Sequence, residues 1–273
     1  MYTDYSVLMS VYKKERAHYL EQAMESMWNQ TVQTNDFILV CDGPLTNELD
    51  AIIAKMKKKY GNKLTVVRIP VNVGLGNALN KGIKYCKNEL VARMDSDDIS
   101  RPERCEHQLK VFNENKEVSV VSGIVEEFSE TKEKIEARRV LPEQHKNILQ
   151  FAKKRNPFNH PCVMYKKSAV EAAGGYKDLY LLEDYYLWIR LLQNGAKGYN
   201  LQEPLLWMRA GSEMYMRRAG GKYARSQRAL FKYMWQTNFI GLTQYMSSIL
   251  IRSMSSVAPN QVREMLFKII VRK

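Results

Sequence analysis

The sequence predicts an α/β protein in which a mostly parallel, mixed sheet of Rossmann-like type is flanked by helices and followed by a C-terminal helical extension. Short apolar segments alternate with amphipathic helical segments through the first hundred residues. Strands separated by helices of this length form right-handed βαβ units, in which neighbouring strands run parallel. A chain of 273 residues can hold one large domain and an extension.

Four apolar segments have the length and composition of buried strands, at residues 6–11, 36–41, 64–69 and 89–94. The spacing of apolar residues predicts helices between them, over residues 15–30, 47–60 and 76–86. Each strand ends in a polar segment, and these segments lie at residues 10–12, 42–44, 72–74 and 95–98. Because ligands bind beyond the carboxyl ends of such strands, we expect the four polar segments to form one site.

The second half of the chain predicts further elements in a less regular order. A helix follows Pro102, with Cys105, Leu109 and Phe112 on its inner face. The charged segment 126–139 predicts an exposed hairpin or loop. The other expected elements are strands at residues 118–125 and 162–165, a helix at 168–173 that ends at two glycines, and an amphipathic helix at 182–192.

The basic excess of the chain lies in its C-terminal tail. The net charge is +13, and residues 217–273 supply +10 of it, with eleven basic residues against one acid. No apolar run approaches the roughly 18 residues that span a membrane, and the N-terminus does not resemble a secretory signal. The cysteines form no C-x-x-C pair, which favours inert thiols in a reducing cytoplasm: Cys41, Cys86, Cys105 and Cys162.

Three acids stand close together after the fourth strand, at Asp95, Asp97 and Asp98. Carboxylates in a D-x-D pattern at a strand end can hold Mg²⁺ or Mn²⁺, which prefer oxygen ligands and share them with a diphosphate. Such a cation acts as a Lewis acid on a departing phosphate. The alternative is that the acids only cap the next helix, as Asp98 would ahead of Ile99. The three other polar segments expected at this edge favour the metal site.

Residues 6 to about 210 resemble a family 2 glycosyltransferase of the GT-A fold, the inverting type that builds bacterial surface polysaccharides. The resemblance is carried by an ordered set of motifs: residues 6–12 with Glu15 close behind, 40–44, 72–80, Ala92-Arg-Met-Asp-Ser-Asp-Asp98, His160-Pro161, Gly174-Gly175-Tyr176 and Glu183-Asp184-Tyr-x-Leu-Trp188. It implies a catalytic domain over residues 1–215, with a nucleotide-sugar half at about 1–100 and an acceptor half at about 101–215. A helical extension would then occupy residues 216–273.

The resemblance implies that the first half binds a nucleotide-sugar, most often a UDP-sugar. The implied contacts are Ser10, Tyr12, Glu15, Asp42, Asn72, Gly74, Asn80, Arg93, Asp95 and Ser96, and Asp97 with Asp95 would bind the metal ion. Tyr12 can stack on a base, and Asp42 can accept a hydrogen bond from a base N–H. The alternatives are a core-edge tyrosine, an Asp-Gly turn, and an exposed strand-end arginine at position 93. NAD binding is not supported, since Leu79 stands where a dinucleotide motif needs its third glycine.

The resemblance places a general base at Asp184, which would take the proton of the acceptor hydroxyl during inversion. Glu183 is the alternative base or an acceptor contact, and both acids could instead be simple helix-start residues. His160 and Trp188 are weaker acceptor candidates, because a loop histidine is more often structural and Trp188 has the spacing of a core residue. The Q-x-x-R-W signature of processive synthases is absent, which favours transfer of a single sugar.

The tail favours an amphipathic anchor on an anionic membrane surface, with the enzyme in the cytoplasm at the inner face of the membrane beside a lipid-linked acceptor. Apolar residues recur at helical spacing in the last segment, at Val262, Met265, Leu266, Ile269 and Ile270. The alternative is a helix pair packed on the catalytic domain or in a homodimer.

The sequence argues against three other classes of protein. A nucleotidyltransferase that makes nucleotide sugars would carry a glycine-rich loop after the first strand, and residues 10–15 do not have one. A nucleic-acid-binding protein would use the basic tail without needing the acids at 95–98, so nucleic acid is not an expected partner. A catalytically silent polysaccharide-binding protein would not need both acid sets.

Overall fold

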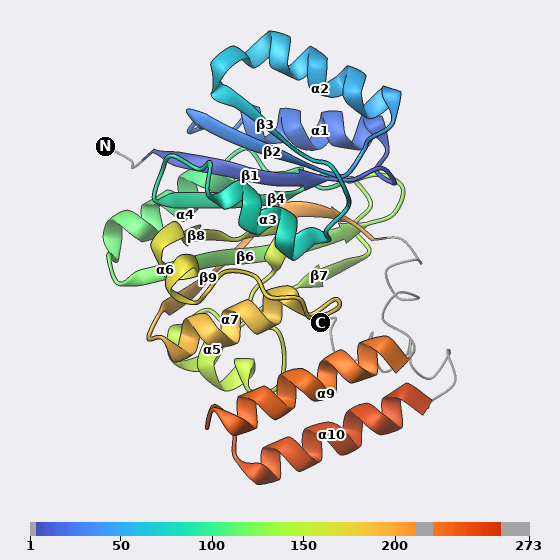
Figure 1. The fold of residues 1–273 in the computed structure, drawn as a ribbon. Helices are drawn as coiled ribbons and strands as arrows, with labels where there is room; N and C mark the ends of the chain where they lie inside the picture. Colours follow the sequence, from blue (N-terminus) through green and yellow to red (C-terminus); the bar gives the residue numbers. More distant parts are fainter. Residues whose placement is uncertain (1–3, 211–220, 258–273) are drawn as a thin grey trace.

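The computed structural model describes residues 4–210 and 221–257, with the side chains of residues 252–257 left out. One mixed sheet runs through the molecule in the order β3-β2-β1-β4-β8-β6-β9-β5, with β7 paired to β6 (Figure 1). The strands are β1 Tyr5–Val11, β2 Asp36–Asp42, β3 Leu64–Ile69, β4 Leu90–Asp95, β5 Ile99–Ser100, β6 Val118–Phe128, β7 Ala137–Arg139, β8 Met164–Lys166 and β9 Lys197–Arg209.

The first four strands are parallel, as the sequence predicts. In the second half β8 lies antiparallel between β4 and β6, and β6 runs parallel to β9. The carboxyl ends of β1, β2, β3 and β4 therefore meet at one edge of the sheet. The four polar segments that follow these strands are brought to that edge.

Helices cover both faces of the sheet. The helices are α1 Ala17–Trp28, α2 Asn47–Tyr60, α3 Leu75–Ile83, α4 Arg104–Glu114, α5 His145–Ala152, α6 Lys167–Ala172, α7 Glu183–Gln193, α9 Gly221–Gln236 and α10 Leu242–Val257, with 3-10 turns at Gly61–Lys63 and His160–Cys162. Helices α1, α2 and α4 pack on one face and α3, α6 and α7 on the other. Successive side chains of β1 point to opposite faces of the sheet. Val7 and Met9 lie in one apolar cluster, and Leu8 lies in the other.

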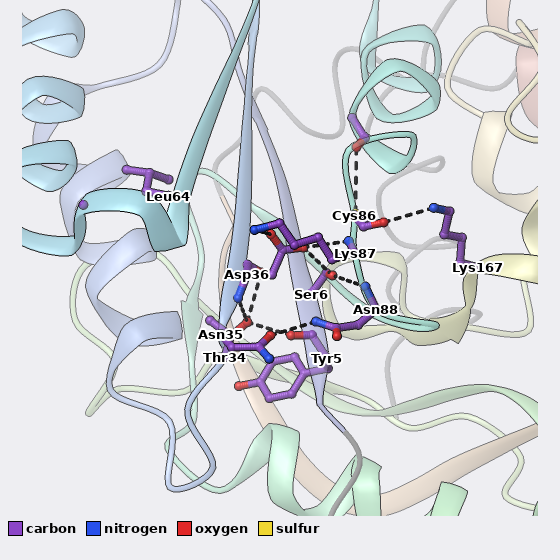
Figure 2. A network of polar contacts seen from close by, with 12 residues as sticks. Tyr5, Ser6, Thr34, Asn35, Asp36, Leu64, Cys86, Lys87, Asn88 and Lys167 are labelled. Atoms are coloured by element: carbon purple, nitrogen blue, oxygen red, sulfur yellow. Dashed lines mark hydrogen bonds and ion pairs between the residues drawn. The ribbon is translucent and has the colours of Figure 1, made fainter.

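A polar network fixes the opposite, amino edge of the sheet (Figure 2). Asp36 at the start of β2 is only 1% exposed, and its carboxylate accepts hydrogen bonds from Ser6 Oγ at 2.6 Å and from the Lys87 backbone N–H at 2.9 Å. Ser6 Oγ accepts in turn from the Asn88 N–H at 3.1 Å. These bonds join β1, β2 and the turn before β4, so the three strands that support the site are held in register far from it.

Helices α9 and α10 lie side by side and pack against each other beyond α5 and α7 (Figure 1). Leu230, Phe231 and Met234 of α9 are buried in a third apolar cluster with Ile189 of α7 and Ala152 of α5. The first part of the tail therefore packs on α5 and α7. The segment around Val262 to Ile270 lies outside the described residues. Among the residues described, no helix is long and apolar enough to cross a membrane.

Most of the predicted elements are confirmed within a few residues, and the four cysteines are free and buried, as expected. The prediction of an exposed segment at 126–139 is wrong at its start. Strand β6 continues to Phe128, and Glu126 and Glu127 are each 1% exposed. Glu126 can be buried because it forms ion pairs with Arg101 at 2.5 Å and with Arg138 at 2.8 Å. The charge of this residue therefore does not indicate exposure.

Candidate active site

Three carboxylates gather where β4 ends. One potential ligand oxygen from each of Asp95, Asp97 and Asp98 lies within 4.8 Å of the others. Burial, followed by the charges of Asp95 and Glu15, raises the pKa of Asp97 to about 7. Burial and the charges of Asp97 and Asp95 also raise the pKa of Asp98 well above its usual range. Crowded, partly buried carboxylates of this kind suit a hard divalent cation, which would relieve their mutual repulsion.

Arg93 is the buried cation at the centre of the site. Its side chain is 1% exposed, and its guanidinium donates to both carboxylate oxygens of Asp95. Nη1 donates to Oδ2 at 2.7 Å, and Nη2 donates to Oδ1. Its positive charge also acts on Asp97, Asp98 and Glu183, opposing the rise of their pKa values. The alternative of an exposed strand-end arginine is therefore wrong. Arg93 contacts Asp95 directly, and its charge also acts on Glu183 at the start of α7.

The loop after β1 is tied to the acid segment. Glu15 accepts a hydrogen bond from Ser96 Oγ at 2.7 Å, and Ser96 itself is 6% exposed. Ser10 lies at the end of β1, opposite Asp95 in the parallel register. The ring of Tyr12 is 39% exposed at the same edge, which leaves a face for stacking. The structure brings these predicted nucleotide contacts together with Asp95.

Asp42 organises the neighbouring loop. Its carboxylate accepts hydrogen bonds from the N–H groups of Val73 at 2.8 Å and Gly74 at 3.0 Å, and from Asn72 Nδ2 at 2.9 Å. Gly74 has a φ of +85°, and a Cβ at Gly43 would lie 2.8 Å from the Asn72 nitrogen. The close approach of the two loops therefore requires glycine at position 43. A direct contact of Asp42 with a base stays a prediction.

Asn80 contacts the turn before α7. Its Oδ1 accepts from the Tyr176 N–H and its Nδ2 donates to the Tyr176 carbonyl, both at 2.7 Å. Tyr176 forms a hydrogen bond through its hydroxyl with His160 Nε2 at 2.9 Å. The side chain of Asn80 thus holds the turn before α7, and its contact with the nucleotide-sugar stays a prediction.

His160 and Trp188 lie deep in the domain. His160 is 8% exposed, and burial, followed by the charge of Arg93, lowers the pKa of its imidazole well below the usual range. Trp188 is fully buried, and its ring meets that of His160 edge-on at 5.9 Å. The weak prediction that Trp188 contacts an acceptor is therefore wrong, and the core alternative holds because the ring offers no surface. An acceptor contact by His160 stays a prediction.

Glu183 and Asp184 open α7 beside the start of α3. A Cβ placed on Gly76 of α3 would lie 3.5 Å from the Cβ of Glu183, so the two helix starts are in contact. Burial and the charge of Asp184 raise the pKa of Glu183 to about 7. Asp184 accepts hydrogen bonds from Asn156 Nδ2 at 2.6 Å and from the Tyr185 N–H at 2.7 Å.

Asn156 is a site residue that the sequence did not indicate. It lies in the loop between α5 and the 3-10 turn at His160, and only its Asn-Pro pattern could have drawn attention to it. Together the described residues give one edge with three acids for a cation, one buried arginine, and two further acids at a helix start. This arrangement can bind a metal-linked diphosphate and offer a carboxylate as a base.

The fold and the two acid sets define the class of GT-A glycosyltransferases. The model of the family described as glycosyl transferase family 2 matches residues 6–174, and the chain belongs to this family. Over 270 residues it is 39% identical to the amylovoran biosynthesis glycosyltransferase AmsE of Erwinia amylovora, a match that covers 97% of this chain and 98% of that protein.

A second relative is the UDP-Gal:alpha-D-GlcNAc-diphosphoundecaprenol beta-1,3-galactosyltransferase of Escherichia coli, 35% identical over 98% of this chain and 97% of its own length. Among solved structures, S. aureus TarS 1-349 with UDP-GlcNAc superposes with a TM-score of 0.70 at 17% identity, over 98% of this chain and 76% of TarS. The mannosyltransferase PcManGT of Pyrobaculum calidifontis, with GDP-Man and Mn²⁺, superposes with a TM-score of 0.65 at 12% identity. The match covers 99% of this chain and 81% of PcManGT. These two structures show the shared fold.

Proposed function

We propose that this glycosyltransferase moves one sugar from a UDP-sugar to a hydroxyl of a lipid-linked saccharide, with inversion, in the synthesis of a bacterial surface polysaccharide. The observation that carries the proposal is a cluster of three carboxylates after β4 together with two further acids that open α7, with the charge of Arg93 acting on both sets. The first can hold a cation with the donor diphosphate, and the second can act on the acceptor. The relatives' names support the donor and acceptor classes.

Asp97 and Asp95 would hold Mn²⁺ or Mg²⁺, and the bound cation would supply Lewis-acid stabilisation of the departing nucleoside diphosphate. Asp98 accepts the Arg209 backbone N–H at 2.9 Å, which fixes the end of the acid segment. Ser10, Tyr12, Glu15, Asp42, Asn72 and Gly74 would surround the nucleotide. Arg93 would orient the Asp95 carboxylate through its paired hydrogen bonds.

Asp184 would remove the acceptor proton as the hydroxyl oxygen attacks the anomeric carbon from the side opposite the diphosphate. The start of α7 favours a negative charge there because the helix dipole is positive at that end. Glu183, with its raised pKa, would be about half protonated at neutral pH and could donate a hydrogen bond to the acceptor. Asp184 is therefore the better base of the two.

The C-terminal pair would hold the enzyme at the inner face of the membrane, where a lipid-linked acceptor lies. The outer face of α10 exposes Leu242, Met246 and Leu250, which are 55%, 59% and 63% exposed and follow one another at helical spacing. Exposed cations stand on the neighbouring α9, at Lys222, Arg225 and Lys232. Residues 1–215 would then act as the catalytic domain and 216–273 as the anchoring extension.

The test is a screen of UDP-, GDP-, CMP- and dTDP-sugars by thermal shift and turnover, with and without Mn²⁺, on a lipid-diphosphate saccharide acceptor. We expect one UDP-sugar to stabilise the wild type only with metal, and product analysis to show inverted stereochemistry. Asp97→Ala should lose the stabilisation, while Asp184→Ala should keep it and lose turnover. The proposal fails if no nucleotide-sugar binds and both variants behave as the wild type does.

A further inference from the structure

We propose that Asn156 is a positioning residue for Asp184, and that its side-chain amide fixes the direction in which the Asp184 carboxylate faces the acceptor. This inference rests on the proposed function, in which Asp184 takes the acceptor proton. Asn156 belongs to a loop after α5, 28 positions from Asp184 in the sequence, and its side chain contacts Asp184.

Both oxygens of the Asp184 carboxylate accept a hydrogen bond. Asn156 Nδ2 donates to Oδ2 at 2.6 Å, and the Tyr185 backbone N–H donates to Oδ1 at 2.7 Å. The last torsion of an aspartate side chain is soft, so an unrestrained carboxylate samples a wide range of orientations. Two donors in different directions fix the plane of the carboxylate. Base catalysis depends on that geometry before it depends on basicity.

Asn156 is itself held in the required orientation. Its Oδ1 accepts the Phe158 N–H at 3.4 Å, which turns Nδ2 toward Asp184. The amide cannot be reversed, because a carboxylate only accepts and a backbone N–H only donates. Pro157 restricts the backbone of Asn156 to extended conformations, and the Pro157 carbonyl accepts from Asn200 Nδ2 at 3.1 Å. The loop therefore presents a rigid donor.

The same amide separates the roles of the two neighbouring acids. Two adjacent carboxylates cannot both ionise without cost, and a donor favours charge on the one it contacts. The amide contacts Asp184, whereas Glu183 lies against Gly76 and carries the raised pKa of about 7. The amide of Asn156 thus stabilises negative charge on the carboxylate proposed as the base and does not contact Glu183.

The experiment compares Asn156→Ala and Asn156→Asp with a matched control in the full chain. Asn194→Ala serves as the control, since Asn194 donates one amide hydrogen bond, to the Ala172 carbonyl at 3.0 Å, at the other end of α7. We expect Asn156→Ala to lower kcat about 10- to 100-fold, with KM for the UDP-sugar within twofold of wild type. The acidic limb of the kcat profile should move to higher pH, and Asn194→Ala should change neither quantity.

Asn156→Asp keeps the acceptor for the Phe158 N–H, so the turn is retained, but it faces Asp184 with a like charge. Its kcat loss should exceed that of Asn156→Ala. In an Asp184→Asn background, Asn156→Ala should cost less than twofold more, because the two residues act as one unit. The inference is overturned if Asn156→Asp retains wild-type kcat, or if Asn156→Ala costs the same factor with and without Asp184. A wild type that transfers no sugar would instead overturn the proposed function itself.

Discussion

At the scale of single residues, the site holds more negative charge than its buried arginine can neutralise. Arg93 forms its paired hydrogen bonds with Asp95 alone, while Asp97 and Glu183 each have a pKa raised to about 7. In both cases burial is the main cause and a neighbouring carboxylate adds to it. An excess of buried acid destabilises the fold and is retained where a cation or a proton transfer needs it.

Glu183→Gln is expected to remove a pH-dependent cost to stability. A carboxyl group with a raised folded-state pKa leaves the folded state more protonated than the unfolded state, so stability falls as pH rises from about 4.5 through about 7. Without metal, the variant should match the wild type near pH 4. It should be more stable at pH 8, by at most about 3 kcal/mol. Melting temperatures across this range measure the effect, and Glu171→Gln, an exposed acid whose charge does not act on Glu183, is the control.

The substitution Asp97→Asn tests whether Asp97 is a ligand of the cation. The substitution keeps the size of the side chain but removes the charge that a hard divalent cation prefers. We expect the variant to lose the increase in melting temperature that Mn²⁺ gives the wild type with a UDP-sugar, and kcat to fall by at least about 100-fold. An unchanged response to Mn²⁺ would show that Asp97 is not a ligand of the cation.

At the scale of elements, helix α3 carries the Asn72–Gly74 loop to the site and depends on a glycine beneath it. A Cβ on Gly82 would lie 2.5 Å from Leu8 Cδ1 and 2.5 Å from Val40 Cγ2, so α3 packs on β1 and β2 at a distance that only glycine allows. We expect Gly82→Ala to destabilise the protein by about 1–3 kcal/mol through overpacking.

Chemical denaturation would measure this cost, and the KM for the donor should rise because α3 moves with its loop. Gly221→Ala is the matched control, since Gly221 begins α9 with nothing within 4 Å of an added Cβ. The control should be neutral or slightly stabilising, because alanine is the better helix former. Equal stability of the two variants would contradict the packing argument.

The first four strands and three helices could be predicted because each has a complete periodic pattern and a polar segment at its end. Strand β9 could not, since Gln202 and Glu203 lie exposed and Pro204 breaks the alternation where the pairing with β6 is irregular. Asp95 and Asp97 could be proposed from the sequence because they lie two positions apart at the end of a strand. Asn156 could not, because its partner Asp184 lies 28 positions away and only the tertiary fold brings them together.

At the scale of the whole molecule, the active edge and the C-terminal helix pair are joined through α7. One side of α7 packs under the sheet through Leu187 and Trp188, and the other packs on α9 through Ile189. The helix that carries Asp184 is therefore also the support of the extension. An enzyme of this form would place its base at a fixed distance from whatever surface the extension binds.

We expect the exposed face of α10 to bind an anionic membrane surface. Leu242, Met246 and Leu250 point away from the domain, whereas Tyr245 and Ile249 pack inward against the third cluster. Burying an exposed leucine or methionine side chain contributes about 1.5–3 kcal/mol, and cations near an anionic surface add to this. Replacing the three residues by serine should lower binding to phosphatidylglycerol-containing vesicles at least about tenfold, as measured by sedimentation.

The same triple variant should keep its turnover on a water-soluble acceptor, because the substituted side chains are exposed and do not support α7. Tyr85→Ser is the matched control, since Tyr85 is 53% exposed near the amino edge of the sheet, away from the extension. Binding of the triple variant to vesicles at the wild-type level would assign this face to another role. A loss of binding by Tyr85→Ser as well would mean that exposed apolar surface in general, rather than the face of α10, drives the association.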